Sequence, residues 1–337
     1  MNVLVIRLSS LGDVLLTTPV LPEVRRKWPG CRVTVLVKKA YVSVFEGNPD
    51  VDEVAVFEDR GLWGWFREIR RRSFHQVIDL HGTFRSFVWT SFGGRADVAR
   101  YDKDIGARRK LVWSKRSSPA LAKNVVQRYL ETVGVSVDVP PTPRLYPSPS
   151  DRLPSWMDRC LGKGPVVGVA PGARHATKCW IPERFAEAAD RLAARLGGPV
   201  VLFGSPSDVP AAEQVMRTLA APCVSLAGKT TLRELLILIR RCSIFLTNDS
   251  GPMHVASAWG VPTVAVFGPT VREFGFFPSG RSVVVQNGEG PDRLYCRPCH
   301  LHGSPSCPER HFRCMSEIDV DQVLAAADTV LKAEGVR

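Results

Sequence analysis

The first 28 residues, MNVLVIRLSSLGDVLLTTPVLPEVRRKW, join a short apolar run, a polar turn with one glycine and an amphipathic segment. Residues 3–6 are rich in β-branched side chains and have the length of a buried strand. Apolar side chains recur at helical spacing through 14–28, which predicts a single helix there. A strand, a turn and a helix in this order open a βαβ unit, so the chain begins as an α/β protein.

The same alternation continues to residue 80. Further apolar runs occupy 33–37, 54–57 and 77–80, and a strongly basic helix is predicted over 62–72. Near-continuous apolar strands separated by helices are typical of a parallel sheet that is covered on both faces. Between 135 and 154, six prolines interrupt the pattern. Proline at this density stiffens a linker and prevents strand pairing, so we place a domain boundary at 150.

A second series of strands and helices follows the boundary. Strands are predicted at 166–170, 200–203, 244–247 and 263–267, with helices at 182–196, 208–219, 231–241 and 320–332. The sequence therefore predicts two Rossmann-like, doubly wound domains, 1–150 and 151–337. Ligands of such sheets bind at the carboxyl ends of the strands, so we expect a cleft between the two domains to hold the site.

Composition narrows the class of protein. The 337 residues are 45% hydrophobic and 23% charged, which excludes wholesale disorder. No apolar run is long enough for a membrane-spanning helix, and the first residues do not resemble a signal peptide, so we expect a cytoplasmic protein. The net charge is +12, and residues 60–116 hold 14 Lys and Arg against 5 Asp and Glu. Such a segment suits an anionic partner, although an ordinary arginine-rich surface would look the same.

Asp13 ends the polar turn after the first strand. A carboxylate at a helix start commonly caps free backbone N–H groups. At the carboxyl edge of a sheet it can also serve as a general base. The turn lacks the G-x-G-x-x-G pattern, so it gives little support to dinucleotide binding.

Two segments of the second domain point to an anion site. In PGARHATKCWIPERF, residues 171–185, Lys178 precedes a predicted helix and could supply charge to a phosphate, or it could be a solvated loop lysine. In NDSGPMH, residues 248–254, Asp249, Ser250 and Gly251 come between a buried strand and a helix start, and His254 follows one turn later. These are ordinary helix-start signals, but they also present backbone N–H groups where a diphosphate could sit.

Four of the nine cysteines form a cluster, Cys296, Cys299, Cys307 and Cys314. The spacing C-x2-C-x7-C-x6-C can close a four-thiolate zinc site, which makes a structural zinc a candidate here. An iron–sulfur cluster, free thiols and redox disulfides are the alternatives.

The motifs together resemble the lipopolysaccharide heptosyltransferases of glycosyltransferase family 9. The resemblance spans nearly the whole chain and keeps the motif order. The matching segments are IR at 6–7, LGDV at 11–14, TP at 18–19, PGA at 171–173, KCW at 178–180, FGS at 203–205, NDSGPMH at 248–254, GVPT at 260–263, FGPT at 267–270 and the cysteine-rich tail.

This resemblance implies a GT-B fold, in which two Rossmann-like domains face each other across a cleft. The first would bind the acceptor and the second the nucleotide-sugar donor. It implies inverting transfer of heptose from ADP-L-glycero-D-manno-heptose to the inner core of lipopolysaccharide, with no catalytic metal. By the same resemblance, Asp13 matches the catalytic base, Lys178 the lysine near the donor phosphates, and Asp249, Ser250, Gly251 and His254 the donor-binding segment; Asp208 lies near a ribose-binding position.

The basic segment 60–116 would then meet the phosphorylated lipid A and core acceptor and the anionic face of the inner membrane. Three alternatives stay open. The fold could use another nucleotide sugar. The net charge alone would also fit a nucleic-acid-binding protein, but no nucleic-acid motif is present, so no nucleic acid is expected. The cysteine cluster could instead belong to a metal-stabilised scaffold without catalysis.

Overall fold

The apolar runs form strands and the amphipathic segments form helices in a computed structural model that describes residues 1–58, 61–92, 96–289 and 292–332. The chain divides into two compact units, and the division at 149/150 lies at the expected linker. The first unit contains Met1–Asp104 and Lys123–Pro149, and the second contains Ile105–Ala122 and the chain from Ser150 onward. The segment 105–122, which a simple division at 150 assigns to the first domain, therefore groups with the second unit.

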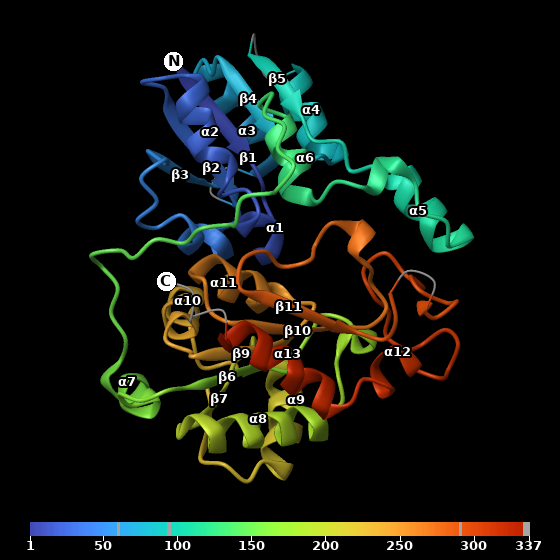
Figure 1. Cartoon of the computed structure of the whole chain (residues 1–337). Coiled ribbons are helices and arrows are strands. Elements are labelled where there is room, and N and C mark those ends of the chain that lie inside the picture. The colour runs from blue at the N-terminus through green and yellow to red at the C-terminus, as the bar shows by residue number, and fades with distance from the viewer. Residues whose placement is uncertain (59–60, 93–95, 290–291, 333–337) are drawn as a thin grey trace. The chain divides into compact units, whose positions relative to one another are not determined.

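The first unit, as far as it is described, holds a five-stranded sheet in the order β3-β2-β1-β4-β5, and all its strand pairs are parallel. Figure 1 shows helices on both sides of this sheet. The elements of the unit are β1 (Asn2–Ile6), α1 (Leu11–Leu15), α2 (Val20–Lys27), β2 (Arg32–Val37), η1 (Lys39–Val44), β3 (Glu53–Val56), α3 (Gly61–Arg71), β4 (Gln76–Asp79), α4 (Phe84–Phe92), β5 (Asp97–Arg100) and α6 (Val125–Glu131).

The helix expected over 14–28 is wrong: the structure has two helices, α1 and α2, with a turn between them. The hydroxyls of Thr17 and Thr18 donate to the carbonyls of Val14 and Leu15, at 2.6 and 2.8 Å. Pro19 then starts α2 and has no N–H to continue the hydrogen bonds of α1. The break confines the first helix to five residues that follow the polar turn.

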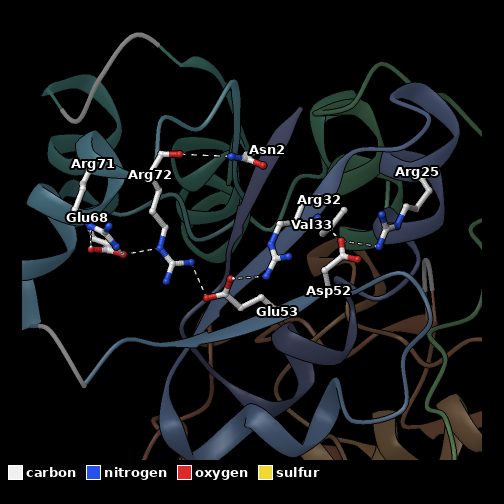
Figure 2. Close-up of polar contacts among 9 residues, drawn as sticks. All are labelled: Asn2, Arg25, Arg32, Val33, Asp52, Glu53, Glu68, Arg71 and Arg72. Carbon is white, nitrogen blue, oxygen red and sulfur yellow. Dashed lines mark hydrogen bonds and ion pairs between the residues drawn. The ribbon is translucent and has the colours of Figure 1, made fainter.

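An ion-pair network lies at the amino-terminal edge of this sheet, where the strands begin (Figure 2). Glu53 pairs with Arg72 at 2.6 Å and with Arg32 at 3.4 Å. Glu68, which is buried in α3, pairs with Arg71 at 2.8 Å and also with Arg72. Part of the basic charge in 60–116 is therefore committed to structural ion pairs and not presented to a partner.

The second unit holds, among its described residues, a six-stranded sheet in the order β11-β10-β9-β6-β7-β8, again with all strand pairs parallel. Its elements are α5 (Ile105–Ser114), η2 (Pro119–Leu121), α7 (Ser155–Leu161), β6 (Val167–Ala170), η3 (Ala176–Lys178), α8 (Pro182–Leu196), β7 (Val200–Leu202), η4 (Pro206–Asp208), α9 (Val209–Thr218), β8 (Cys223–Ser225), α10 (Leu232–Arg240), β9 (Ile244–Asn248), α11 (Gly251–Trp259), β10 (Thr263–Phe267), η5 (Arg272–Phe274), β11 (Ser282–Gln286), α12 (Arg313–Ser316) and α13 (Val320–Lys332).

The segment 105–122 joins this unit through a small apolar cluster. Leu111 and Leu121 are buried together with Val271 and Phe274. The ammonium group of Lys115 donates to the carbonyl of Pro298 at 2.8 Å. Arg108 and Arg109, which belong to the predicted basic segment, therefore lie on the second unit. Among the described residues, no helix combines the length and the apolar composition that a membrane-spanning helix needs.

Candidate functional site

The two sheets have the same topology, and this fixes where a ligand can bind. Counted along the chain, the strands of the second sheet have the order 6-5-4-1-2-3, and the first sheet has the order 3-2-1-4-5. In both sheets the connections leave in opposite directions from the first and fourth strands, which creates a crevice at their carboxyl ends. In the first unit the segments at this switch point follow β1 and β4, and in the second they follow β6 and β9. The predicted residues Asp13, Lys178 and Asp249 lie on three of these four segments.

Asp13 and Arg7 form an ion pair at the switch point of the first unit. Arg7 Nη2 lies 2.6 Å from Asp13 Oδ1. The other oxygen, Oδ2, accepts from the backbone N–H and the hydroxyl of Ser10, at 3.2 and 2.8 Å. Asp13 is thus a helix-start residue, as the capping alternative predicts. Its side chain keeps 19% exposure, against 7% for Arg7, so Asp13 is the less buried member of the pair.

The surroundings of Asp13 keep it ionised. Burial is the largest single effect and acts to raise the pKa of Asp13, but the charge of Arg7 and the hydrogen bonds from Ser10 and Arg7 outweigh it. The pKa of Asp13 therefore lies below its usual value. Arg7 is itself held by the carbonyl of Leu80, 2.6 Å from Nη1, at the end of β4. The guanidinium fixes the carboxylate in its charged form and in one orientation.

Asp79, the last residue of β4, is a switch-point residue that the sequence analysis missed. It is fully buried, and Oδ1 accepts from the backbone N–H groups of His81 and Gly82, both at 3.0 Å. Its Oδ2 is buried without a hydrogen-bond partner among the described residues. A polar residue that ends an otherwise apolar strand was the available signal, in the sequence Val77-Ile-Asp-Leu-His81.

Lys178 and Asp249 form the corresponding ion pair in the second unit. Lys178 Nζ lies 2.6 Å from Asp249 Oδ2. The same oxygen accepts from the hydroxyl of Thr270, also at 2.6 Å. Lys178 ends the η3 turn after β6, and Asp249 follows β9, so the pair joins the two sides of the switch point. Lys178 is not a solvated loop lysine, because its side chain is only 15% exposed.

Asn248 ties these two segments together. Its amide Nδ2 donates to the carbonyl of Pro171 at 2.7 Å, and its Oδ1 accepts from the backbone N–H of Trp180 at 2.9 Å. Asn248 is fully buried, so both bonds are shielded from water. The indole of Trp180 is also buried and donates to the carbonyl of Ile318, which makes it a packing residue.

The remaining residues of the predicted donor segment lie at the start of α11. Ser250 is the N-cap residue, and its hydroxyl is 3.3 Å from that of Thr247. Gly251 is the first helical residue. His254 lies one turn further and is buried. The N–H groups at the start of α11 come directly after Asp249 in the chain, and an anion site at this place stays a prediction.

Asp208 approaches the same switch point from the end of β7. A Cβ atom on Gly172 would lie 2.2 Å from Asp208 Oδ1, so a larger residue there would displace the Asp208 side chain. Asp208 Oδ2 accepts from the backbone N–H of Ser205 at 2.8 Å. In Rossmann-like sheets, an acidic residue near the end of the second strand commonly binds the nucleoside ribose. Asp208 has the chemistry and the topological place for that role.

The four clustered cysteines are all free thiols. Burial is the main cause that raises the pKa of the Cys314 thiol to about 12. The charges of Cys299, Cys296 and Cys307 raise this pKa further, which indicates that the four sulfurs lie in the same region. In the part of the chain that is described, however, no three or more His, Cys, Asp or Glu side chains are arranged to hold a metal ion. The expected four-thiolate site is not assembled in this structure, and a structural zinc stays a prediction.

Comparisons with known proteins agree with this architecture. Residues 62–295 match the family model described as glycosyltransferase family 9 (heptosyltransferase). The chain is 29% identical to lipopolysaccharide heptosyltransferase 2 of Salmonella typhimurium, over 100% of both chains. The solved structure of a family 9 glycosyltransferase from Veillonella parvula aligns with a TM-score of 0.77 at 25% identity, covering 98% of this chain and 97% of that one.

A second solved structure, the ADP-heptose lipopolysaccharide heptosyltransferase II of Escherichia coli, aligns over 100% of both chains with a TM-score of 0.78 at 23% identity. These likenesses confirm the expected GT-B fold class with its two parallel-sheet units. The family match covers more than two thirds of the chain and includes both segments that form the Lys178–Asp249 pair. This protein therefore belongs to glycosyltransferase family 9, the heptosyltransferase family.

Proposed function

We propose that the protein transfers heptose from ADP-L-glycero-D-manno-heptose to the inner core of lipopolysaccharide, either to lipid A bearing Kdo or to its heptosylated form, with inversion at the sugar carbon. The observation that carries the proposal is the Lys178–Asp249 pair beside the N–H groups of α11, at the switch point of the second sheet. Full-length similarity to a lipopolysaccharide heptosyltransferase supports this choice of donor and acceptor.

On the acceptor side, Asp13 acts as the general base. Its carboxylate takes the proton of the acceptor hydroxyl while that oxygen forms a bond to the anomeric carbon of heptose. Arg7 keeps Asp13 ionised, so the base is ready at neutral pH. A positioned base contributes about 10²–10⁴-fold to the rate of such a step.

On the donor side, the bond between the anomeric carbon and the diphosphate oxygen breaks, and ADP leaves with both electrons. Lys178 supplies positive charge to the departing diphosphate, and the N–H groups of Ser250 and Gly251 supply donors. Asp249 is held by Lys178 and by the hydroxyl of Thr270, so its role is to orient the lysine. Asp208 binds the ribose of the nucleoside.

Incubation of the purified protein with ADP-heptose and a lipopolysaccharide that lacks heptose tests the proposal. Mass spectrometry should show the gain of one heptose unit, and NMR should show an inverted anomeric centre. Calorimetry with ADP-, UDP- and GDP-sugars decides between this donor and another nucleotide sugar. Transfer from a UDP- or GDP-sugar in place of ADP-heptose would overturn the donor assignment but not the family.

The outer faces of α3 and α4 fit an anionic lipid surface, and we propose that the protein contacts the membrane there. Trp63 is 72% exposed and Phe84 is 83% exposed. Trp63, Arg67 and Arg70 are all exposed and share one face of α3 by helical spacing. Both helices bury their inner tryptophans in the same core cluster, so their outer faces belong to one layer of the first unit. Exposed aromatic rings beside guanidinium groups are typical of interfacial membrane binding.

Co-sedimentation with vesicles tests this contact. We expect binding to vesicles rich in phosphatidylglycerol, weaker binding to phosphatidylcholine, and a loss of about tenfold or more in Trp63→Ser/Phe84→Ser. The matched control is Val139→Ser, which removes an equally exposed apolar side chain from the same unit outside α3 and α4. Equal binding by both variants would contradict the proposal.

A further inference from the structure

The cysteine-rich segment, residues 296–314, contacts the proposed donor site of the second unit at three points. Lys178, Asp249 and Thr270 are linked in a series by an ion pair and a hydrogen bond. We propose that residues 297–304 position Lys178 by contacts at both ends of this series, near Lys178 and at Thr270. The inference rests on the proposed donor role of Lys178, and it assigns a function to a segment whose cysteines form no metal site in this structure.

The first contact joins Ser304 to Thr177, the residue before Lys178. The backbone N–H and the hydroxyl of Thr177 both donate to the carbonyl of Ser304, at 3.2 and 2.9 Å. The backbone N–H of Ser304 donates back to the Thr177 hydroxyl at 2.8 Å. Thr177 is 3% exposed, so water does not compete for these bonds. Three hydrogen bonds thus fix the turn that carries Lys178.

Gly303 lies directly against the side chain of Lys178. A Cβ atom on Gly303 would lie 3.0 Å from both Cγ and Cδ of Lys178, and 2.9 Å from Cβ of His175. The φ of Gly303 is +93°, a conformation that side-chain-bearing residues rarely adopt. The backbone of the segment therefore forms a wall along the lysine and limits the directions in which the ammonium group can point.

A further contact joins Arg297 to Thr270, the residue at the opposite end of the Lys178–Asp249–Thr270 series. Arg297 is 1% exposed, and its Nη2 donates to the carbonyl of Thr270 at 2.9 Å. The same guanidinium donates to the carbonyl of Asn287 at 2.8 Å and to Oε1 of Gln286 at 2.7 Å. Because the hydroxyl of Thr270 donates to Asp249, a shift of Thr270 would move the carboxylate that orients Lys178.

A double-mutant cycle on Thr177 and Lys178 tests the inference. Thr177→Val keeps the shape of the side chain and its backbone N–H but removes the hydroxyl. We expect ADP to bind about three- to tenfold more weakly and the KM for the donor to rise by a similar factor, because a buried donor and acceptor lose their partner. Thr177→Ser should restore both values. The KM for the acceptor should not change.

In a Lys178→Ala background, Thr177→Val should have no further effect on ADP binding, because it acts through the lysine. The matched control is Thr263→Val, which removes a fully buried hydroxyl that donates to Val261 at 2.7 Å, at the opposite edge of the same sheet. It should lower the thermal stability without changing ADP affinity. Gly303→Ala is the second variant if Thr177→Val does not fold, and it should also weaken ADP binding.

The outcomes separate the two proposals. If Lys178→Ala leaves ADP binding unchanged, the donor role of Lys178 fails. If Lys178→Ala weakens binding but Thr177→Val and Gly303→Ala do not, the donor role stands and the positioning role of the cysteine-rich segment is overturned. Additive losses of affinity in the double variant would also overturn it.

Discussion

Each unit carries a cation–carboxylate pair at its switch point, and the two pairs differ in which member is more exposed. Both pairs are 2.6 Å long. In the first unit the carboxylate is the more exposed member, with Asp13 at 19% and Arg7 at 7%. In the second unit the order is reversed, with Lys178 at 15% and Asp249 at 9%.

This reversal suggests which member of each pair contacts the substrate and which member only holds its partner in place. A buried ion that has a partner is costly to remove but cannot reach a substrate, whereas its more exposed partner can. The more exposed group should therefore react, and the buried group should hold its charge and direction. This difference agrees with the proposed roles, a base on the first unit and a cation on the second, which are two groups that sugar transfer from a diphosphate needs.

The largest expected effect is that of Asp13→Asn. The variant keeps the size of the side chain but cannot accept a proton, so kcat should fall about 10²–10⁴-fold. Calorimetry should show ADP affinity close to that of the wild type, because the proposed donor site lies on the other unit. If kcat stays near the wild-type value while only thermal stability drops, Asp13 is a capping residue and the comparison fails for the first unit.

Lys178→Met should have the next largest effect. It removes the proposed cation and leaves Asp249 buried without its partner, so kcat/KM should fall about 30-fold or more, equivalent to about 2 kcal/mol. ADP affinity should fall together with kcat, unlike in Asp13→Asn. Thermal unfolding of the variant separates the lost contact with the donor from a loss of stability. Unchanged kinetics would remove Lys178 from the site.

Of the three variants, Arg7→Met should lower kcat least at neutral pH. It should change the pH dependence of kcat/KM most clearly. Burial acts to raise the pKa of Asp13, and the charge of Arg7 is the largest effect that opposes it, so the pKa of Asp13 should rise when the guanidinium is removed. The acid limb of the kcat/KM profile should therefore move to higher pH, with kcat at alkaline pH nearly preserved. A profile whose acid limb does not move would show that Arg7 does not control the ionisation of Asp13.

The Arg7–Asp13 pair should also make the stability of the protein fall at low pH. Because the pKa of Asp13 is lowered in the folded state, the pair stabilises the protein above the unfolded pKa of aspartate. This contribution is lost as the pH falls through the lowered, folded value. Arg7→Met should therefore lose more stability at pH 7 than at about pH 2, below the unfolded pKa of aspartate, which urea unfolding at the two pH values can measure.

The sequence was enough to pick out three of the four segments that lie at the switch points, although it did not give the strand order. Strands such as Val3–Ile6 and Ile244–Thr247 are contiguous and β-branched, so their ends, and the polar residues after them, can be placed without tertiary information. Helix α8 was predicted with its observed bounds, because Pro182 starts it and Gly197, with a φ of +70°, ends it. The break at Pro19 was missed because apolar spacing continues on both sides of the turn.

Contacts between distant segments could not be predicted in this way. Thr177 and Ser304 are 127 residues apart, and nothing in either local sequence indicates the other. The ion pair between Glu53 and Arg72 (Figure 2) could not be predicted from local sequence either, because Glu53 lies on β3 and Arg72 follows the end of α3. The exposures of the members of the two ion pairs, on which the proposed roles rest, depend on the same long-range packing.

The passage of the chain between the two units limits how the protein can be cut. The backbone changes unit at 104/105, at 122/123 and at 149/150. A fragment that ends at residue 150 would expose Leu111 and Leu121, whose apolar partners Val271 and Phe274 it lacks. A fragment made from residue 151 onward would expose Val271 and Phe274, because it lacks Leu111 and Leu121. To divide the protein into two fragments without exposing this cluster, residues 105–122 would have to be joined to the second fragment. If the intact protein is cut once in the proline-rich stretch, the two pieces should stay associated, because residues 105–122 of the first piece pack on the second.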